Sequence, residues 1–565
     1  MQARDQAHRL AAEGRTQLAA GQAQAALGLY DEALRLDPDF MPALQGRCQV
    51  FQALGRPAQV IAACEQALAR SPDDAGLLYS RAVGLRLLSR WSEAEAGFRR
   101  VIALRPRDGA GHGGLAGVLE AQGRLTEARA AYKTAIERNP ADADSLNNLG
   151  NLLNRLGDAA GSLDCLNRAI AARPGFAEAL NNLGTVQAAS GDLAAALASY
   201  RAALAIRPDF LPALVNMGAA LADAGEPRQA IEAYDRALAV QPENASAHWN
   251  RGLVRLLTGD FAGGWADYAY RWQTGDFRAR RRNLPQAPWR GEPLAGKRIL
   301  LWAEQGIGDE IMFLGLAREL LAAGASMAVE CDPRLMPLLS RSLPGIETIP
   351  RRETPDPRTA SAEFAFQAPT GDLLRWLRSD RQSVRPLGGY LRADTARTAQ
   401  LRSRFLAAGH ERLVGLSWHS ANAAAGKRRS IAAELLAPFL NLPGWGVVDL
   451  QYGNRAEDRV VLKQVTGRDM LHEPAIDAMQ DLDGWAAEIA SVDVVVSIDN
   501  SAVHLAAALG KPVLLLLPTA PDWRWFDSGD RAAWYADTRL LRQGRAGDWQ
   551  GPRTLALALL TAWPR

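Results

Sequence analysis

This sequence of 565 residues has few cysteines and no long apolar run. Its four cysteines show neither metal-ligand spacing nor the density of a disulfide-stabilised domain. The strongest apolar run, Val513 to Leu517, is strand-sized and far below the roughly 18 residues of a membrane helix. The N-terminal segment is charged and lacks the apolar core of a secretory signal. These absences predict a cytoplasmic protein without a membrane span.

Histidine and excess charge are also scarce. The seven histidines are scattered without ligand spacing, so we predict no metal site. A net charge of +3 at pH 7 is too balanced to indicate nucleic-acid binding. One basic cluster, Arg278 to Arg282, is interpreted as a solvated linker, with contact to an acidic ligand or a membrane surface as the alternative.

The most informative feature that is present is a repeat. Prolines recur every 34 residues through the first half of the chain, at Pro38, Pro72, Pro106, Pro140, Pro174, Pro208 and Pro242. A fixed period of this length indicates an array of identical supersecondary units. Stacked units build a long concave surface that is suited to binding partners.

Other positions keep the same register. A glycine recurs where the first helix of each unit should end, with Ser89 as the exception, and there it tolerates left-handed backbone. An aromatic residue recurs in the second helix, with Cys64 and Leu166 as substitutes, and an alanine follows three positions later. The proline is expected to open the next helix or to stand just before it. The pattern resembles the tetratricopeptide repeat (TPR) family over roughly residues 7–275, as seven full units and a partial eighth.

Asparagines form a further ladder in the later units, at Asn148, Asn182, Asn216 and Asn250. Because a side-chain amide both donates and accepts, such a row can hold an extended peptide backbone. The ladder resembles that in the TPR superhelix of the O-linked N-acetylglucosamine transferase family, which implies binding of a protein acceptor. Hydrogen bonding between repeats is the alternative interpretation.

After residue 297 the pattern changes to short apolar runs that alternate with helical stretches. Predicted strands at residues 299–302 and 327–330 flank a glycine loop and a helix at 311–323, which is a βαβ unit opening a parallel sheet. In the loop, Gly306 and Gly308 allow a tight turn and close ligand approach at a helix N-terminus.

A second series of strands is predicted at residues 414–418, 447–451, 492–498 and 513–517. Polar side chains gather where these strands end, and a basic loop at 426–430 follows the first of them. The economical interpretation is two Rossmann-like halves with a cleft between the carboxyl ends of their strands.

The stretch from Asp499 to Leu509 reads Asp-x-x-x-x-His-Leu-x-Ala-Ala-Leu. Together with Gly308-Asp309, it resembles the ADP-heptose:lipopolysaccharide heptosyltransferase family over about residues 298–565. That resemblance implies a GT-B fold, no metal, a sugar-donor diphosphate at the helix N-terminus after Asp499, Asp309 as general base, and Lys427 near the donor. The family has Thr-Gly where this chain has Asn500-Ser501, and Trp-Pro where it has Arg429-Ser430. The donor's base and sugar therefore stay open.

The layout as a whole has a second resemblance. Trp265, Tyr268, Arg271 and Trp272 precede the linker, and Glu-Gln-Gly-Ile-Gly-Asp follows it. This arrangement is similar to that of bacterial TPR-containing glycosyltransferases, some of which modify flagellin in the cytoplasm.

These arguments give a set of candidate residues. Asp309 and His504 are assigned as catalytic, and Asn148, Asn182, Asn216 and Asn250 as acceptor-binding. The residues assigned to donor binding are Gly306, Gly308, Ser417, His419, Lys427, Arg428, Gln451, Asp499, Asn500, Ser501 and His504.

Each assignment has a structural alternative. Asp309 can be only a helix cap, and His504 a satisfied core histidine. Residues 427–429 can be a solvated loop, and His419 a polar group at the end of a strand. Trp523 and Trp525 are expected to cover the cleft rather than line it.

We therefore predict an all-α TPR superhelix followed by an α/β GT-B module of two Rossmann-like halves. The expected parts are residues 1–275 for the array, 276–297 for a linker, 298–400 for the acceptor-side half and 401–565 for the donor-side half. The predicted function is sugar transfer from a nucleotide sugar, without other cofactors, to a protein hydroxyl recruited by the array, with flagellin as a candidate acceptor. The alternatives are a heptosyltransferase-like enzyme acting on a glycolipid or glycan, and a scaffold whose transferase module is inactive.

Overall fold

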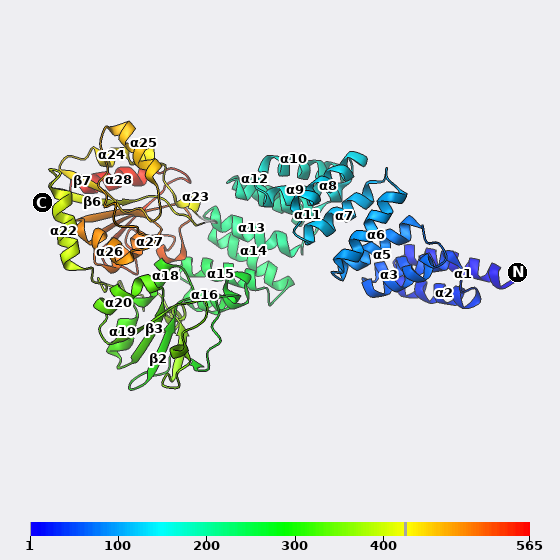
Figure 1. Ribbon diagram of the computed structural model, residues 1–565, viewed down its shortest axis with the longest axis horizontal. Helices are drawn as coiled ribbons and strands as arrows, with labels where there is room; N and C mark the ends of the chain where they lie inside the picture. The colour runs from blue at the N-terminus through cyan, green and yellow to red at the C-terminus, as the bar shows by residue number, and fades with distance from the viewer. Residues whose placement is uncertain (1, 423–425, 565) are drawn as a thin grey trace. The chain divides into compact units, whose positions relative to one another are not determined.

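The computed structural model describes residues 2–422 and 426–564 of the chain. The N-terminal half of this described part consists of eight helix pairs. The helices are α1 (Gln2–Ala19), α2 (Ala23–Leu36), α3 (Met41–Ala53), α4 (Pro57–Leu68), α5 (Ala75–Leu87), α6 (Trp91–Leu104), α7 (Gly109–Ala121), α8 (Leu125–Arg138), α9 (Ala143–Arg155), α10 (Ala159–Ala172), α11 (Ala177–Ala189), α12 (Leu193–Ile206), α13 (Leu211–Asp223), α14 (Pro227–Val240), α15 (Ala245–Thr258) and α16 (Phe261–Tyr268) (Figure 1).

The recurring positions have the roles that their residue types predict. Every glycine of the turn inside a helix pair, from Gly21 to Gly259, has a positive φ, and Ser89 in the same slot has φ 57°. The aromatic positions are buried, with Tyr30 and Phe98 at 0% exposure. The proline stands three residues before the next helix, as Pro38 does before α3, and so lies in the turn rather than in the helix. Its fixed φ therefore rigidifies the turn between units.

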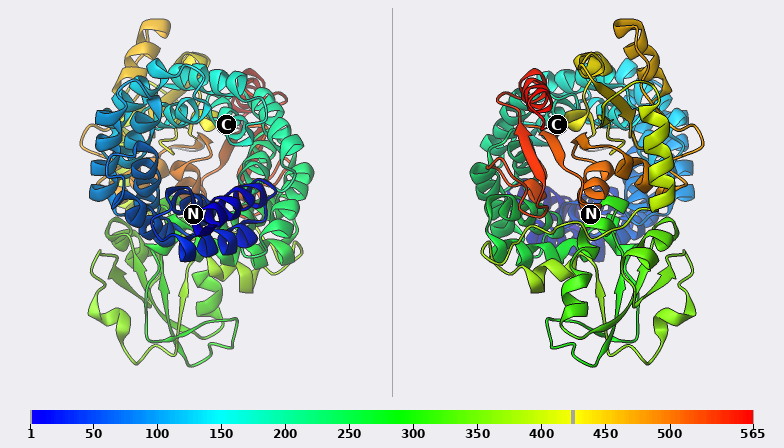
Figure 2. Two further views of the ribbon diagram at one scale, coloured as in Figure 1. Left: turned by 90° about the vertical axis from the view of Figure 1, so that its right-hand side faces the viewer. Right: turned by 90° about the vertical axis from the view of Figure 1, so that its left-hand side faces the viewer.

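The first sheet of the C-terminal half is parallel and has the order β1-β5-β2-β3-β4. Its strands run side by side in Figure 2, drawn in green. They are β1 (Ala287–Pro288), β2 (Arg298–Trp302), β3 (Ser326–Cys331), β4 (Ile346–Pro350) and β5 (Phe366–Pro369). The helical segments of this half are η1 (Ala269–Gln273), α17 (Gly275–Arg278), α18 (Ile307–Leu314), α19 (Ala317–Ala322), η2 (Pro333–Leu335), α20 (Met336–Ser342), η3 (Pro357–Ala360) and α21 (Asp372–Leu377).

The second sheet is also parallel and has the order β10-β9-β8-β6-β7. Its strands are β6 (Arg412–Ser417), β7 (Trp445–Asp449), β8 (Val494–Ile498), β9 (Val513–Leu517) and β10 (Thr538–Arg542). Its helical segments are α22 (Thr395–Leu406), α23 (Gly426–Arg429), η4 (Ala433–Leu436), α24 (Ala437–Leu440), α25 (Ala456–Thr466), α26 (Leu482–Ser491), α27 (Ser501–Ala508), η5 (Trp523–Trp525) and α28 (Gln550–Thr561). The predicted fold class, an all-α TPR superhelix followed by an α/β module, is confirmed.

Each sheet has one point where the strand order reverses. In the first sheet the chain moves outward from β2 through β3 to β4 and then returns to β5 on the other side of β2. In the second sheet it moves from β6 to β7 and then returns to β8 on the other side of β6. Loops that leave adjacent strands in opposite directions open a crevice at the carboxyl ends of the strands, which is where ligands bind in such sheets.

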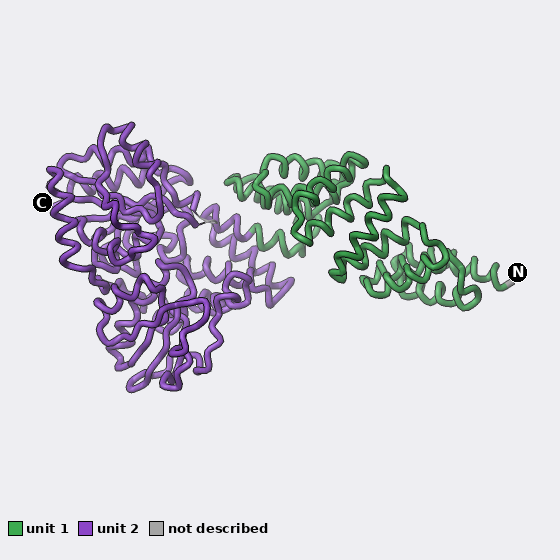
Figure 3. Tube along the Cα trace, in the orientation of Figure 1, with its two compact units in different colours: residues 1–217 green, residues 218–565 purple. Residues whose placement is uncertain are grey.

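The compact units of the chain divide elsewhere than at the domain boundaries proposed from the sequence. Residues 1–217 form one unit and residues 218–565 the other, so α14, α15 and α16 belong with the α/β module (Figure 3). The segment 276–297, expected to be a linker, contributes β1 and the buried Trp289 to the first sheet. Helix α22, which spans the expected boundary at residue 400, packs against α26 of the second half.

Within residues 2–422 and 426–564, no helix has both the length and the apolar character needed to cross a bilayer.

Candidate active site

A pocket of about 420 Å³ lies where the reversal points of the two sheets face each other. Such a volume is typical of small-molecule sites. Its walls come from the loop after β2, the ends of β6 and β8, the loop after β9 and helix α15. The lining residues are Trp249, Leu253, Gln305, Gly306, Ile307, Gly308, Asp309, His419, Ser420, Ala421, Asn422, Arg429, Tyr452, Asp499, Asn500, Ser501, His504, Asp522, Trp523 and Arg524.

The first wall is the glycine loop at the N-terminus of α18. Gly306 is the N-cap residue, and its backbone N–H donates to Asp309 Oδ2 at 3.2 Å. The other carboxylate oxygen of Asp309 pairs with Arg524. Gly308 lies against α27, because a Cβ atom there would be 2.9 Å from Cδ2 of His504. The glycine therefore permits the close approach of two helices that belong to different halves.

The second wall is held together by Gln451. Its Oε1 accepts hydrogen bonds from the backbone N–H groups of Trp418, at 2.9 Å, and His419, at 2.8 Å. Its Nε2 donates to the carbonyl oxygen of His419 at 3.0 Å. Gln451 and Ser417 are buried behind the wall and do not line the pocket, whereas His419 does. Gln451 and Ser417 therefore fix the conformation of the loop after β6 and do not contact the pocket themselves.

Asn500 is the N-cap of α27. Its Oδ1 accepts from the N–H of Ala502 at 3.0 Å, and its Nδ2 donates to Ser417 Oγ at 2.8 Å and to the His419 carbonyl at 3.2 Å. The side chain thereby joins the ends of β6 and β8. Ser501 begins α27 and lines the pocket, so the N-termini of both α18 and α27 face the same space. Helix N-termini attract anions.

His504 is buried on α27, with 5% of its surface exposed, and reaches the pocket. Its Nδ1 lies 2.9 Å from the Tyr535 hydroxyl, and its ring stacks on Trp525 at 5.5 Å. Burial, and secondarily the Arg524 guanidinium, lower the pKa of His504 to about 4. The imidazole is therefore neutral at pH 7, which a proton acceptor requires.

An alternating chain of charges runs along the pocket. Arg429 Nη1 lies 2.8 Å from Asp499 Oδ2, and Arg429 Nη2 lies 3.3 Å from Asp522 Oδ2. Arg524 Nη1 lies 2.6 Å from Asp522 Oδ1, and Nη2 of the same arginine pairs with Asp309. Burial raises the pKa of Asp499 despite the opposing effect of Arg429. Burial also favours a raised pKa for Asp522, but Arg524 and Arg429 outweigh it and lower that pKa to about 2.

Besides Ser417 and Gln451, two further residues proposed for the donor do not line this pocket. Lys427 is exposed on α23 and is not among the lining residues. Arg428 pairs with Asp223 of α13 and lines a neighbouring cavity of about 170 Å³. The cation that α23 presents to the pocket is the next residue, Arg429.

The last repeat forms part of the site. Trp249 and Leu253 of α15 line the pocket. Behind them, the fully buried Arg271 lies 2.7 Å from Asp372 Oδ1 and 3.3 Å from Glu304 Oε1. Gln305 is also bonded to the last repeat, because its Nε2 donates to the Tyr268 hydroxyl at 2.6 Å. The two motifs that flank the predicted linker in sequence are therefore in direct contact.

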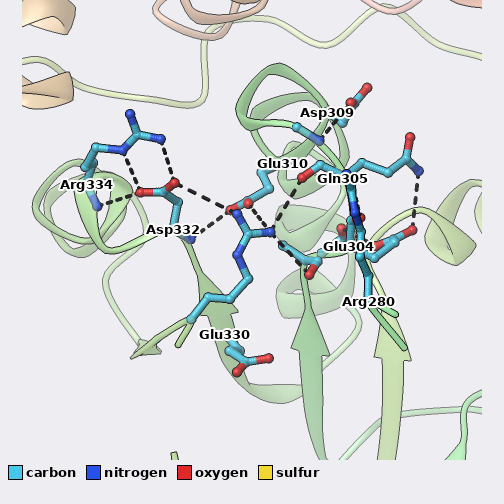
Figure 4. A network of polar contacts seen from close by, with 12 residues as sticks. Arg280, Glu304, Gln305, Asp309, Glu310, Glu330, Asp332 and Arg334 are labelled. Carbon is cyan, nitrogen blue, oxygen red and sulfur yellow. Dashed lines mark hydrogen bonds and ion pairs between the residues drawn. The ribbon is translucent and has the colours of Figure 1, made fainter. Parts of the chain in front are cut away.

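A second polar network supports the glycine loop from the other side (Figure 4). The buried Glu310 accepts from the N–H of Asp332 at 2.9 Å and lies 2.8 Å from Arg351. Burial raises the pKa of Glu310 to about 7, with Arg351 opposing. The basic cluster is also engaged, since Arg282 donates to the buried Glu330 at 2.9 Å and 3.1 Å, and Arg280 to the Glu304 carbonyl at 3.3 Å. Arg282 is therefore part of the folded module, whereas Arg278, Arg280 and Arg281 are exposed.

In the array, the asparagine ladder makes hydrogen bonds between repeats. Asn182 Nδ2 donates to Asn147 Oδ1 at 2.9 Å, and Asn216 Nδ2 donates to Asn181 Oδ1 at 3.0 Å. Farther along, the Asn250 side chain bonds to the Tyr234 hydroxyl. This is the arrangement of the alternative interpretation, and peptide binding by these amides stays a prediction.

Three charged residues of the pocket, Arg429, Asp522 and Arg524, were absent from the candidates chosen by sequence. Arg429 ends the basic run that supplied Lys427 and Arg428, and sequence cannot say which of three neighbours points inward. Asp522-Trp-Arg524 repeats the spacing of Asp332-Pro-Arg334 and Asp356-Pro-Arg358, where an aspartate caps a short helix and pairs with the arginine two residues on. This recurring Asp-x-Arg spacing was the signal in the sequence from which Asp522 and Arg524 could have been chosen as candidates. Trp523 lines the pocket and Trp525 lies behind His504.

Comparison with known proteins identifies the array. Tetratricopeptide-repeat models match residues 17–83, 79–143, 115–175 and 147–209, and a TPR-repeat model matches residues 218–259. The helix pairs of this chain are TPR repeats. Repeats of this type bind protein partners.

A curated relative is the protein FlbA of Caulobacter vibrioides, which is 30% identical over 313 residues. The match covers 53% of this chain and 52% of that protein, so it spans about half the length of the relative. Solved structures with partial likeness include the APC/C hetero-tetramer Cut9–Hcn1, with 19% identity, TM-score 0.38, and 47% of this chain and 52% of that chain covered. Another is YrrB, described as a TPR protein with an unusual peptide-binding site, with 23% identity, TM-score 0.28, and 33% and 95% covered.

Proposed function

We propose that this protein is a glycosyltransferase that moves a sugar from a nucleotide-sugar donor to a hydroxyl group of a protein acceptor docked by the TPR repeats. The observation that carries the proposal is the pocket itself. It combines two helix N-termini, two arginines, three carboxylates and a neutral histidine between two parallel sheets. These are the groups that transfer from a diphosphate leaving group requires.

In the proposed reaction, the acceptor hydroxyl oxygen bonds to the anomeric carbon of the sugar, and the bond between that carbon and the diphosphate oxygen breaks. The nucleoside diphosphate leaves with the bonding electron pair, and the hydroxyl proton passes to a base. The N-termini of α18 and α27 and the two arginines would stabilise the charge that develops on the leaving group.

Asp309 and His504 are the two candidates for the base. Both oxygens of Asp309 already have partners, Arg524 and the Gly306 N–H. His504 is neutral at pH 7 and has one ring nitrogen engaged by Tyr535. We assign the base to Asp309, because its side chain is partly exposed to the pocket whereas His504 is buried.

The assignment is tested by Asp309→Asn and His504→Gln. Asp309→Asn keeps an oxygen for the Gly306 N–H but takes up no proton, so turnover should fall by about two to four orders of magnitude without loss of nucleotide affinity. A larger loss of turnover in His504→Gln, with near-normal turnover in Asp309→Asn, would transfer the role to His504. Melting temperatures of both variants serve as the folding control.

The primary test of the proposed function is a thermal-shift panel of nucleoside diphosphates and nucleotide sugars. A ligand present at 100 times its dissociation constant stabilises the folded state by about 2.7 kcal/mol. The nucleotide that stabilises the protein is then offered as its sugar donor, with flagellin as the first acceptor and with and without EDTA. Transfer that persists in EDTA would agree with the expected metal independence.

Two other outcomes lead to the alternatives. Transfer to a glycolipid or glycan, and not to protein, would indicate a heptosyltransferase-like enzyme. A lack of response to every nucleotide would favour a scaffold that works through its repeats alone. The cytoplasmic location expected from the sequence stays a prediction.

A further inference from the structure

Asp522 bridges the two arginines of the pocket. Its Oδ1 lies 2.6 Å from Arg524 Nη1 and its Oδ2 lies 3.3 Å from Arg429 Nη2, so one carboxylate spans two guanidinium groups. Guanidinium groups bind carboxylates and phosphates with the same fork of N–H donors. The two guanidinium groups that hold Asp522 are therefore donors of the kind that also bind a phosphate group.

We propose that Arg429 and Arg524 are the anion-binding pair for the donor diphosphate, and that Asp522 is an internal carboxylate which the diphosphate replaces. The identity of the diphosphate as that of a nucleotide sugar rests on the proposed function. The pairing of the arginines with an exchangeable carboxylate rests on the geometry alone.

The charge balance of the pocket favours such an exchange. The two arginines are matched by three carboxylates, those of Asp309, Asp499 and Asp522. With all three carboxylates ionised, the set has one negative charge in excess, and the diphosphate of a nucleotide sugar adds about two more. Like charges within a few ångströms repel strongly in a partly buried site. Binding is therefore more favourable when at least one carboxylate leaves the arginines.

Asp522 is the carboxylate best placed to leave. Asp499 is only 4% exposed and is fixed at the end of β8, while Asp309 completes the capping box of the eight-residue α18. Asp522 caps only the three-residue η5. Asp522 lies in the loop after β9 with 21% of its side chain exposed. Because its pKa is about 2, Asp522 stays ionised near neutral pH and would move away as a carboxylate rather than be neutralised in place.

A purely structural role for Asp522 explains only one of its two oxygens. Its Oδ1 caps η5 by accepting from the Arg524 N–H at 3.2 Å. Asp356 caps η3 in the same way, but both of its oxygens bond to its own Arg358, each at 3.0 Å. The Oδ2 of Asp522 instead reaches Arg429, 93 residues away in the sequence. Helix capping does not require this contact between Asp522 and Arg429.

The experiment is isothermal titration of the full-length protein with inorganic pyrophosphate. Asp522→Asn and Asp522→Ser both keep a good helix-capping side chain and remove the charge. We expect each to bind pyrophosphate about tenfold more tightly than the wild type, because the internal competitor is gone. Arg429→Met should bind it about tenfold more weakly or not at all. Asp356→Asn is the matched control, with the same change at a helix cap outside the pocket, and should bind like the wild type.

Two results would overturn the inference. One is a folded Asp522→Asn or Asp522→Ser protein whose pyrophosphate affinity does not rise. The other is an Arg429→Met protein whose affinity does not fall. If a nucleoside diphosphate binds the wild type and these variants equally well, the inference fails while the proposed function stands. If the pyrophosphate affinities change as expected but no nucleotide binds and no sugar is transferred, the arginine pair stands and the proposed function fails.

Discussion

At the scale of single residues, Gly308 determines how closely the two α/β halves approach. A Cβ atom at this position would be 2.9 Å from His504 Cδ2 and 3.4 Å from the Ser501 Cα. The histidine ring cannot easily give way, because it is bonded to Tyr535 and stacked on Trp525. Gly308→Ala should therefore destabilise the module by about 1–3 kcal/mol and displace His504.

The measurement is a urea unfolding curve together with turnover. Gly275→Ala is the control, because Gly275 begins α17 and nothing lies within 4 Å of the place that a Cβ atom would take there. Gly275→Ala should leave both readouts within error of the wild type. Equal stability and turnover in Gly308→Ala would show that α18 and α27 tolerate a methyl group and that the close approach is not required.

Glu488 provides a residue-scale prediction about pH. It is 4% exposed in a second pocket, and burial raises its pKa to about 8, with Asp449 and Glu473 adding to the effect and the Glu473 N–H opposing it. The folded state thus keeps a proton that the unfolded state releases above pH 4.5. The contribution of Glu488 to the free energy of unfolding is fully present below pH 4.5. It falls by up to about 1.4 kcal/mol per pH unit as the pH rises to about 8.

Glu488→Gln removes that titration. We expect the variant to match the wild type near pH 5 and to exceed it in urea midpoint at pH 8–9. The exposed Glu457→Gln on α25 serves as the control and should follow the wild type at every pH. Parallel pH profiles for Glu488→Gln and the wild type would contradict the assignment.

Sequence could indicate some of the site and not the rest. Asp309, Asp499 and His504 lie beside glycines, strand ends and a helix start, so local pattern identifies them, and all three reach one pocket. The roles of Arg429 and Arg524 in the pocket became visible only in the fold, because their partners Asp499 and Asp309 are distant in sequence, and the recurring Asp-x-Arg spacing marks only a capped turn at Arg524. Which cation of a basic run points inward depends on tertiary packing, and Lys427 illustrates the error that local pattern allows.

At the scale of elements, the asparagine ladder joins α9, α11 and α13. Its amides bond across repeats, from Asn182 to Asn147 and from Asn216 to Asn181, and both acceptors are buried. Replacing Asn182, Asn216 and Asn250 together by Ala should therefore loosen the array, at about 0.5–1.5 kcal/mol for each lost bond. Hydrogen–deuterium exchange of the full chain should become faster in α11 and α13.

Acceptor transfer by the same triple variant separates the two roles of the ladder. Unchanged exchange with a loss of transfer to protein would mean that the amides bind peptide rather than one another. Donor hydrolysis is the internal control, because the pocket residues are untouched.

The helices of the repeats were predictable from the sequence, and the shortest or mixed-composition strands were not. The 34-residue register predicted the helix pairs, because several independent positions repeat in one phase. Strands β2, β3, β6, β8 and β9 are apolar runs beside recognisable loops. Strand β1 has two residues, and β4 and β10 mix charged with apolar residues, so none of these has a distinct pattern. Pairing with a neighbouring strand fixes them in place.

At the scale of the whole molecule, the sequence predicted a boundary at residue 275, where the repeat period stops. The chain instead has its compact unit from residue 218 onward, which includes three helices of the array. The reason is burial of α15 and α16 against the module: Trp265 Nε1 donates to the Arg378 carbonyl at 2.9 Å, and Trp265 packs on Trp523 at 5.6 Å. Periodicity reports how units repeat, and it does not report where the last unit finds its packing partner.

Truncation tests this boundary. A chain that starts at Pro208 keeps α13 to α16 and all lining residues of the pocket, so it should fold, bind the nucleotide of the wild type and hydrolyse the donor slowly. It should lose transfer to a protein acceptor if the preceding repeats dock that protein.

A chain that starts at Asp276 lacks Arg271 and so leaves the buried Glu304 without its charged partner. Removing one member of a buried ion pair costs about 3–5 kcal/mol, and Trp249, Leu253 and Trp265 are lost as well.

We therefore expect the shorter chain to be unfolded or aggregated by circular dichroism and size-exclusion chromatography, and the longer one to melt close to the wild-type module. Adding Glu304→Gln to the shorter chain removes the unpaired charge and should recover part of the fold, which identifies the ion pair as one cause. A well-folded, nucleotide-binding chain that starts at Asp276 would show that the array is dispensable for the site. Full acceptor transfer by the chain that starts at Pro208 would show that the first six helix pairs dock some other partner.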